Sequence, residues 1–116
     1  MLQAIEKFEN LNTLDFTKVR FTPDDAASMD FKKFAPKMKI LRFSYCGQLS
    51  DNIEQNILLM KNLETLVMSN CESLTNDFLI KIERNCKELK ELDVSGEFYL
   101  NPIISFKCFE KAYLKK

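Results

Sequence analysis

Apolar and polar residues alternate along this chain in a pattern that returns about every 26 residues. Each unit opens with a leucine or methionine and has further apolar residues three and five positions later. The units open at Leu11, Met38, Leu63 and Leu89, which are 27, 25 and 26 residues apart. A period of this length indicates a repeat protein, in which every unit forms the same small supersecondary element.

Each unit changes its hydrophobic period halfway along. In the third unit Leu66 and Met68 are two residues apart, as on one side of a β-strand. Phe78, Ile82 and Cys86 then follow at intervals of four, which places them on one face of a helix. The pattern therefore predicts a strand followed by a helix in every unit. We expect strands centred on Leu14–Phe16, Leu41–Phe43, Leu66–Met68 and Leu92–Val94.

Two helix starts carry residues that are typical of helix caps. Thr22 precedes Pro23, so a capping threonine stands before a proline at the first helical position. Further along, Asp51 and Glu54 have the spacing of a capping box. These signals predict that helices begin at these two places.

One strand and one helix cannot bury both of their apolar faces, whereas stacked neighbours can. The chain is therefore expected to form one α/β domain, a short solenoid of about four repeats with parallel strands on the concave side and helices on the convex side. Its expected parts within 1–116 are an N-terminal helix at 1–10, repeats at 11–37, 38–62 and 63–88, and a last repeat at 89–116 that ends in a capping helix over Pro102–Leu114.

The stretches Leu41–Asp51 and Leu66–Asn76 resemble the cysteine-containing leucine-rich repeat, and the likeness covers about residues 11–96. Repeats of this family occur in F-box/LRR substrate receptors of ubiquitin ligases, in relatives without an F-box, and in short proteins such as ATP synthase coupling factor B (subunit s). The chain departs from the pattern at Val19 and at Ser95, where no cysteine stands. No F-box-like helical segment precedes the repeats, so docking on a Skp1-type adaptor is not carried over from the resemblance.

The cysteines are expected to be structural. Cys46 and Cys71 occupy the same repeat position, and a free cysteine behaves as a small buried hydrophobe. Cys86 and Cys108 receive the same interpretation, because both stand among apolar residues. The four cysteines are spaced by 25, 15 and 22 residues, which fits no zinc-site template. The positions expected to be structural are Cys46, Cys71, Leu41, Leu66 and Leu92.

The strand residues that alternate with the buried ones should point away from the helices and form a surface on the concave side. The predicted partner-binding residues are Ile40, Arg42, Ser44, Tyr45, Thr65, Val67, Ser69, Asn70, Glu91 and Asp93. Ile40, Arg42, Tyr45 and Val67 are the expected hot spot, because arginine and tyrosine are favoured anchors in protein interfaces. The rows predicted across the sheet are Asp15, Arg42, Val67, Asp93 and the hydroxyl row Thr17, Ser44, Ser69, Ser95. The alternative is a solvated sheet face on which Arg42 pairs with Asp15 and Tyr45 covers a turn.

The composition argues against catalysis and against nucleic acid as a partner. The chain has no histidine, its two glycines form no phosphate-binding loop, and its 17 basic residues balance 17 acidic ones. Asp15 and Asp93 are expected three strands apart, roughly 14 Å, which is too far for a pair of catalytic carboxylates. We therefore expect no enzyme, no cofactor and no metal site.

The expected function is protein binding without catalysis, as a small adaptor or accessory subunit that docks onto a larger, multi-subunit complex. The alternative is a substrate-recognition module of an F-box/LRR-type ubiquitin-ligase receptor. An open N-terminal edge of the solenoid is a second candidate contact surface. The sequence has no signal-peptide pattern and no apolar run of the ~18–20 residues that a membrane span needs. An intracellular, reducing location is expected, in the cytoplasm or alternatively in mitochondria.

Overall fold

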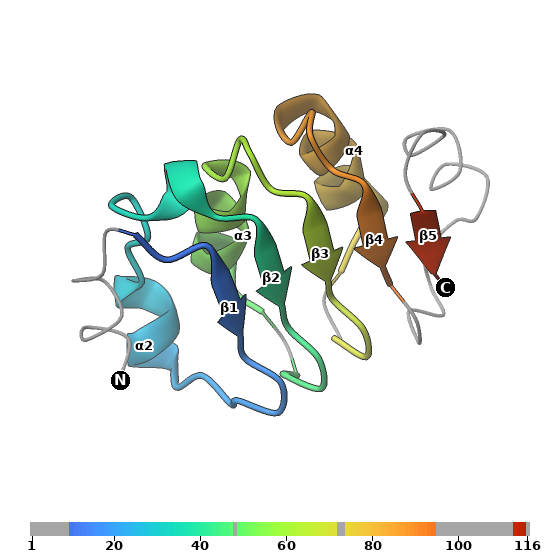
Figure 1. The fold of residues 1–116 in the computed structure, drawn as a ribbon. Coiled ribbons are helices and arrows are strands. Elements are labelled where there is room, and N and C mark those ends of the chain that lie inside the picture. The colour runs from blue at the N-terminus through green and yellow to red at the C-terminus, as the bar shows by residue number, and fades with distance from the viewer. Residues whose placement is uncertain (1–9, 48, 72–73, 95–112, 116) are drawn as a thin grey trace.

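Parallel strands that follow one another in chain order form the sheet of this protein (Figure 1). The structure is a computed structural model that describes residues 10–47, 49–71, 74–94 and 113–115. The strands are β1 (Thr13–Asp15), β2 (Ile40–Arg42), β3 (Thr65–Val67), β4 (Glu91–Asp93) and β5 (Tyr113–Lys115). Every neighbouring pair is parallel. The predicted α/β class is confirmed.

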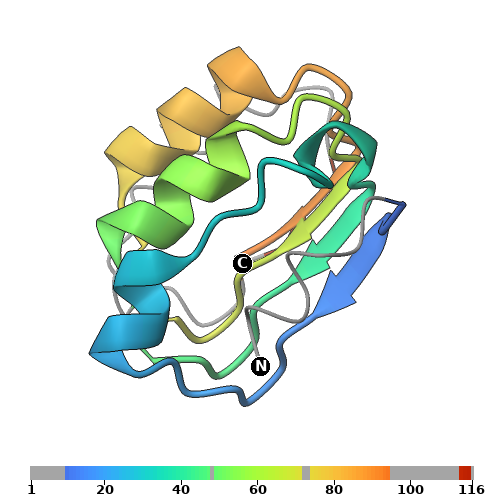
Figure 2. The same cartoon turned by 90° about the vertical axis from the view of Figure 1, so that its left-hand side faces the viewer.

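The helices return the chain from the end of one strand to the start of the next, as parallel pairing requires. They are α2 (Pro23–Ser28), the short 3₁₀ helix η1 (Ala35–Lys37), α3 (Asp51–Leu58) and α4 (Asn76–Asn85). Figure 2 shows α2, α3 and α4 side by side in one layer on one side of the sheet. Among the described residues no helix lies on the other side of strands β1–β4.

Each α-helix begins after a hydroxyl residue in extended conformation. The side-chain oxygens of Thr22, Ser50 and Thr75 accept backbone N–H groups three residues ahead, at 3.1, 3.3 and 3.2 Å. The cap predicted at Thr22 is confirmed. The capping box predicted at Asp51 is wrong, because Ser50 is the cap and Asp51 is already the first helical residue. The carboxylate of Asp51 instead lies in the first turn, where negative charge favours the positive end of the helix dipole.

The regular strands begin one residue earlier than predicted and are centred on Leu14, Leu41, Leu66 and Leu92. Backbone hydrogen bonding continues beyond their ends, because Phe43 N donates to Val67 O at 2.7 Å and Tyr45 N donates to Ser69 O at 3.1 Å. The expected residues therefore do pair across the sheet. The chain then turns at Lys18, Tyr45 and Asn70, which have positive φ values.

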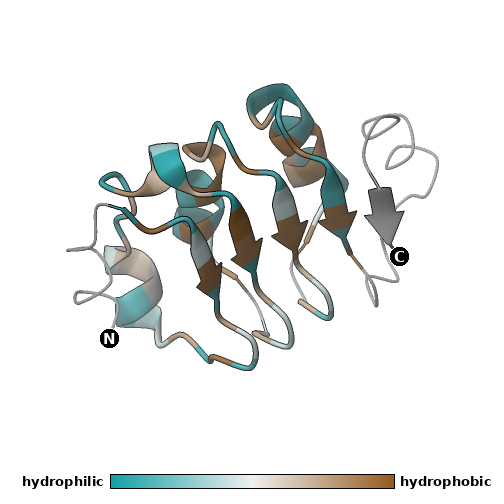
Figure 3. Ribbon diagram, in the orientation of Figure 1, coloured by the Kyte–Doolittle hydropathy of each residue, from teal (hydrophilic) through white to brown (hydrophobic). Residues whose placement is uncertain are grey.

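The core lies between the strands and the helix layer. Leu41, Leu66 and Leu92 are fully buried there, as expected of structural positions. Figure 3 shows a hydrophobic section, in brown, on each of the strands β1–β4. At the β1 end, the Phe16 ring stacks on Phe43 with the ring centroids 5.1 Å apart. An aromatic cluster therefore continues the core toward the first strand.

The chain ends were predicted to be helical, and one part of this prediction is wrong. Tyr113–Lys115 form strand β5, which pairs with β4 in the register Glu91↔Tyr113, so the predicted capping helix does not extend over Tyr113 and Leu114. Pairing provides hydrogen-bond partners for backbone groups at the edge of β4, which a helix would not do. The rest of that helix, the N-terminal helix up to residue 9, Ser95 and Cys108 lie outside the described residues.

Candidate protein-binding surface

The side of the sheet opposite the helices is lined by the outward side chains of β1–β4, and we call it the strand face. Alternation along β2 shows how it arises: Leu41 is fully buried, whereas Ile40 and Arg42 on either side are partly exposed. The same pattern holds for β3 and β4. All ten predicted binding residues lie on the strand face or in the turns that follow it, and none of them is buried. Their role in binding stays a prediction.

The strand register brings the predicted central row together. Arg42 is the partner of Asp15 on one side and of Val67 on the other, and Val67 is the partner of Asp93. A cationic side chain and an apolar one are therefore direct neighbours in the middle of the strand face. In the next row Ser44 Oγ and Ser69 Oγ are 2.9 Å apart, which confirms that part of the predicted hydroxyl row.

Asp15 is held by Thr17 more than by Arg42. Its Oδ1 atom accepts hydrogen bonds from both the hydroxyl and the backbone N–H of Thr17. These two bonds, with a smaller contribution from the charge of Arg42, lower the pKa of Asp15 below its ordinary value. In the described part of the chain the two ion pairs both involve Glu64, so the predicted alternative of an Arg42–Asp15 ion pair does not form. Within the described residues Arg42 therefore acts on Asp15 through its charge alone, without an ion pair.

A left-handed residue follows each of the first three strands. Lys18, Tyr45 and Asn70 have φ values of 64°, 58° and 55°. This conformation is costly for residues with a β-carbon and is best tolerated by glycine, asparagine and aspartate. The equivalent position in the fourth unit is Gly96, which lies outside the described residues. Tyr45 is thus a bulky residue in a backbone conformation that is costly for it, and the residue is 56% exposed.

The cysteines after these turns tie each unit to the one before it. The Cys46 thiol donates to the carbonyl oxygen of Phe16 at 2.8 Å, and the Cys71 thiol donates to that of Phe43 at 3.1 Å. Burial raises the pKa of Cys46, and it raises the pKa of Cys86 to about 11. These three described cysteines are buried, as predicted, and form no disulfide. The raised pKa values of Cys46 and Cys86 disfavour their reactive thiolate forms.

A row of charges borders the strand face at the start of the strands, and sequence reasoning missed it. Glu64 forms ion pairs at 3.1 Å with Lys39 and with Lys90. Hydrogen bonds from Lys39 and then Lys90 lower the pKa of Glu64. The signal was present in the sequence, because these three residues stand directly before successive strands at the repeat spacing.

Asn56 is a second feature that the sequence analysis missed. It is 5% exposed, and its Oδ1 atom accepts the backbone N–H of Phe31 at 2.9 Å while its Nδ2 atom donates to Met29 O at 3.1 Å. One amide therefore holds the irregular segment between α2 and η1. The sequence feature that could have revealed Asn56 is its position as a polar residue on the same helix face as the apolar Ile53 and Ile57.

Comparisons with known proteins return no matching family model, no matching curated protein and no matching solved structure. Within the described ranges the structure contains no helix of the length and apolarity that spanning a membrane requires. Over the same residues no histidine, cysteine, aspartate or glutamate side chains gather in a group that could hold a metal ion. The class of protein that can be stated is therefore α/β with a parallel sheet.

Proposed function

We propose that this chain is a non-catalytic protein-binding module, a short leucine-rich-repeat solenoid of about four repeats that acts as a small adaptor or accessory subunit of a larger protein complex. The strand face is its contact surface, and Ile40, Arg42, Tyr45 and Val67 are the anchors. A reducing compartment, the cytoplasm or mitochondria, suits the described cysteines, which are buried and form no disulfide.

The exposure of Tyr45 is the observation that carries this proposal. Folding stability alone favours asparagine or glycine at this left-handed turn, and Asn70 stands at the equivalent place one unit later. Tyr45 instead combines a strained backbone with a half-exposed aromatic ring that contributes little to the core. Local strain of this kind is concentrated at functional sites, and tyrosine is a frequent interface anchor.

The surroundings of Tyr45 suit an anchor. Backbone hydrogen bonds join the turn to its neighbours on both sides, because Lys18 N donates to Ser44 O at 2.7 Å and Tyr45 N donates to Ser69 O at 3.1 Å. The Cys46 thiol adds a bond directly after the turn. A rigid surface loses little conformational entropy on binding, so more of the contact free energy contributes to affinity.

The same local interactions recur in successive units, which supports the proposal of a leucine-rich-repeat solenoid. Units of nearly equal length share a hydroxyl cap before the helix, a left-handed turn after the strand and, in the second and third units, a thiol bonded to the preceding strand. The strand order follows the chain order, as in stacked repeats. Repeats of this kind present a preformed surface for other proteins.

The experiment is affinity capture of the tagged chain from its native cells, with mass spectrometry of the proteins that co-purify. The wild type is compared with the double variant Arg42→Glu/Val67→Asp and with Lys32→Glu, a control at an exposed residue outside the strands. We expect the double variant to lose the specific partners and the control to retain them. Full retention by the double variant would mean that the strand face is not the binding surface.

The captured set also distinguishes the two versions of the function. Subunits of one large complex in constant proportion indicate an accessory subunit. Cullin-type ligase components accompanied by varied clients indicate a substrate-recognition module, the alternative that the cysteine-containing repeat pattern favours. Either set must disappear with the double variant for the strand face to be the site.

A further inference from the structure

The first strand of the sheet has a neighbour on one side only among the described residues. β1 pairs with β2 alone, whereas β2, β3 and β4 each pair on both sides. A strand with an unpaired edge offers a row of backbone N–H and C=O groups to another strand. The described sheet ends in β1 on one side and in β5 on the other (Figure 1).

The outer edge of β1 carries the backbone groups that an added parallel strand needs. The carbonyl of Arg42 in β2 accepts the N–H of Phe16 at 2.8 Å. The N–H of Ile40 in β2 donates at 3.0 Å to the carbonyl of the residue directly before β1. The residues of β1 in register with these two are Asp15 and Thr13. β1 can therefore receive a parallel strand as β2 receives β1.

The apolar residues of the first unit are less covered than their equivalents. Leu14 is only partly buried, whereas Leu41 and Leu66 in the same row have no exposed surface. Val19 is likewise partly buried, whereas Cys46, at the same place in the second unit, is buried. A strand added at the outer edge of β1 would complete the burial at this end of the core.

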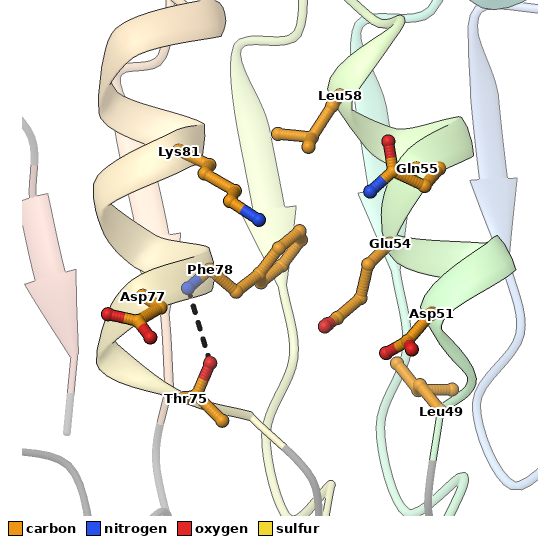
Figure 4. A pocket seen from close by; sticks show the side chains of 9 residues that line it. All are labelled: Leu49, Asp51, Glu54, Gln55, Leu58, Thr75, Asp77, Phe78 and Lys81. Carbon is orange, nitrogen blue, oxygen red and sulfur yellow. Dashed lines mark hydrogen bonds between the residues drawn. The ribbon is translucent and has the colours of Figure 1, made fainter.

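The second and third units show how two units are joined. A cleft of about 460 Å³ lies between their helices, lined by Glu54 from α3 and by Lys81 from α4 (Figure 4). The Oε2 atom of Glu54 is buried without a hydrogen-bond partner, and no ion pair joins α3 to α4. The strands of the same two units are hydrogen-bonded even beyond their regular ends, where Phe43 N donates to Val67 O at 2.7 Å. A paired strand is therefore the first requirement for adding a further unit.

Strand β5 has the register to fill the outer edge of β1 in a second copy of the chain. Leu114 continues the leucine row, because it is in register with Leu92. Lys115 stands in the row that begins with Asp15. When β5 of one copy continues this register onto β1 of the next, Leu114 comes beside Leu14. The same pairing places Lys115 beside Asp15, and opposite charges on neighbouring strands are favourable.

Charge selects this pairing over a symmetric one. Two copies joined through their β1 edges would place two Asp15 carboxylates on the same short strand pair. Two copies joined through their β5 edges would place two Lys115 residues together in the same way. Like charges across a strand pair are destabilising. The parallel pairing of β5 with β1 is the one in which residues of opposite charge meet.

We propose that β5 of one copy pairs with the outer edge of β1 of a second copy, so that this protein associates with itself head to tail. This contact goes beyond the proposed function, because it uses the two ends of the sheet and none of the strand-face anchors. It joins two different surfaces and does not close on itself, so it produces oligomers of increasing length.

Analytical ultracentrifugation of the full-length chain tests the proposal. The weight-average mass is measured as the protein concentration is raised from about 5 µM to about 500 µM, a range that covers weak association. We expect the mass to rise above the 13.6 kDa of the monomer without levelling off at twice that value. A constant monomer mass, or a plateau at the mass of a dimer, would overturn the proposal.

Two charge reversals make the test specific. Asp15→Lys and Lys115→Asp should each stay monomeric over the same range, because like charges then meet at the contact. An equimolar mixture of the two should associate again, because opposite charges then meet at both contacts between them. Lys87→Asp makes the same change at an exposed residue of the loop after α4 and should associate as the wild type does.

The mixture also controls for folding, since only folded chains can regain the contact. Association of Lys115→Asp alone at wild-type strength would overturn the proposed pairing. Failure of the mixture to associate, with both variants folded by circular dichroism, would do the same.

Discussion

The two sides of the same short strands differ in what surrounds their side chains. On the helix side Leu41, Leu66 and Leu92 have no exposed surface, and each occupies the same place in its unit. On the strand face Arg42 and Val67 remain partly exposed, and the residues change in kind from one strand to the next. The helix side therefore supplies most of the stability of the fold. The strand face is less constrained by folding, which is what the proposed role in binding requires of it.

The largest expected change in the free energy of unfolding comes from comparing two adjacent residues of β3, one on the helix side and one on the strand face. Leu66→Ala removes a fully buried side chain and should lower the free energy of unfolding by about 2–5 kcal/mol. Val67→Ala, on the strand face, should cost less than about 1 kcal/mol. Urea unfolding followed by circular dichroism measures both. Equal losses would contradict the assignment of stability to the helix side.

The next effect concerns the one described polar residue that is buried in the core. Asn56→Ala leaves the backbone N–H of Phe31 without its partner and should lower the free energy of unfolding by about 1–3 kcal/mol. Gln55→Ala, at the exposed neighbouring residue, is the control and should change stability little. Hydrogen exchange provides a second measurement, because the amide of Phe31 should lose its protection. A cost no larger than that of Gln55→Ala would show that Asn56 does not hold this segment.

A smaller change, this time an increase in the free energy of unfolding, is expected from substitutions at the left-handed turns. Tyr45→Asn relieves the backbone strain at an exposed position and should raise the free energy of unfolding by about 0.5–1 kcal/mol. Lys18→Asn makes the same change at the equivalent turn and should have a similar effect. A loss of stability in Tyr45→Asn would mean that the tyrosine contributes to the fold, which would weaken its interpretation as an anchor.

The smallest effect is the pH dependence that Glu54 introduces. Burial and the charge of Asp51 raise the pKa of Glu54, so the folded state favours the protonated carboxyl group. The stabilisation is complete below the ordinary glutamate pKa and is lost as pH rises through the raised value. Glu54→Gln should therefore be more stable than the wild type at about pH 7, and this advantage should shrink toward about pH 4. Glu88→Gln, at an exposed residue of the loop after α4, is the control. The same advantage at both pH values would exclude ionisation of Glu54 as its cause.

Much of the fold could be predicted from the sequence, because the repeat length and the alternation of buried and exposed strand residues can both be read from short stretches of the chain. The spacing of Leu41, Leu66 and Leu92 was enough to place the strands, their inward side and the row that joins Arg42 to Val67. The cysteine positions followed from the same period. The predicted surface therefore agrees with the structure in position, although its function stays a proposal.

The features that the sequence analysis missed depend on contacts between segments far apart in the chain. Asn56 bonds to backbone groups 25 and 27 residues away, and no local pattern encodes those partners. The buried oxygen of Glu54 depends on how closely α4 approaches α3. Strand β5 lies outside the repeat period, and the spacing of apolar residues around it is that of a helix. The predicted cap of α3 differs from the observed one by a single residue, because Ser50 and Asp51 are adjacent and both are good capping residues.

The most direct test of the central claim compares binding by Tyr45→Asn and Lys18→Asn. Both variants should be at least as stable as the wild type, so a loss of binding cannot be attributed to unfolding. With the partners identified by affinity capture, the affinity of each variant is measured in solution. Tyr45→Asn should weaken binding by roughly tenfold or more, as removal of a hot-spot tyrosine does, while Lys18→Asn should leave it nearly unchanged. Unchanged affinity in Tyr45→Asn would contradict the account.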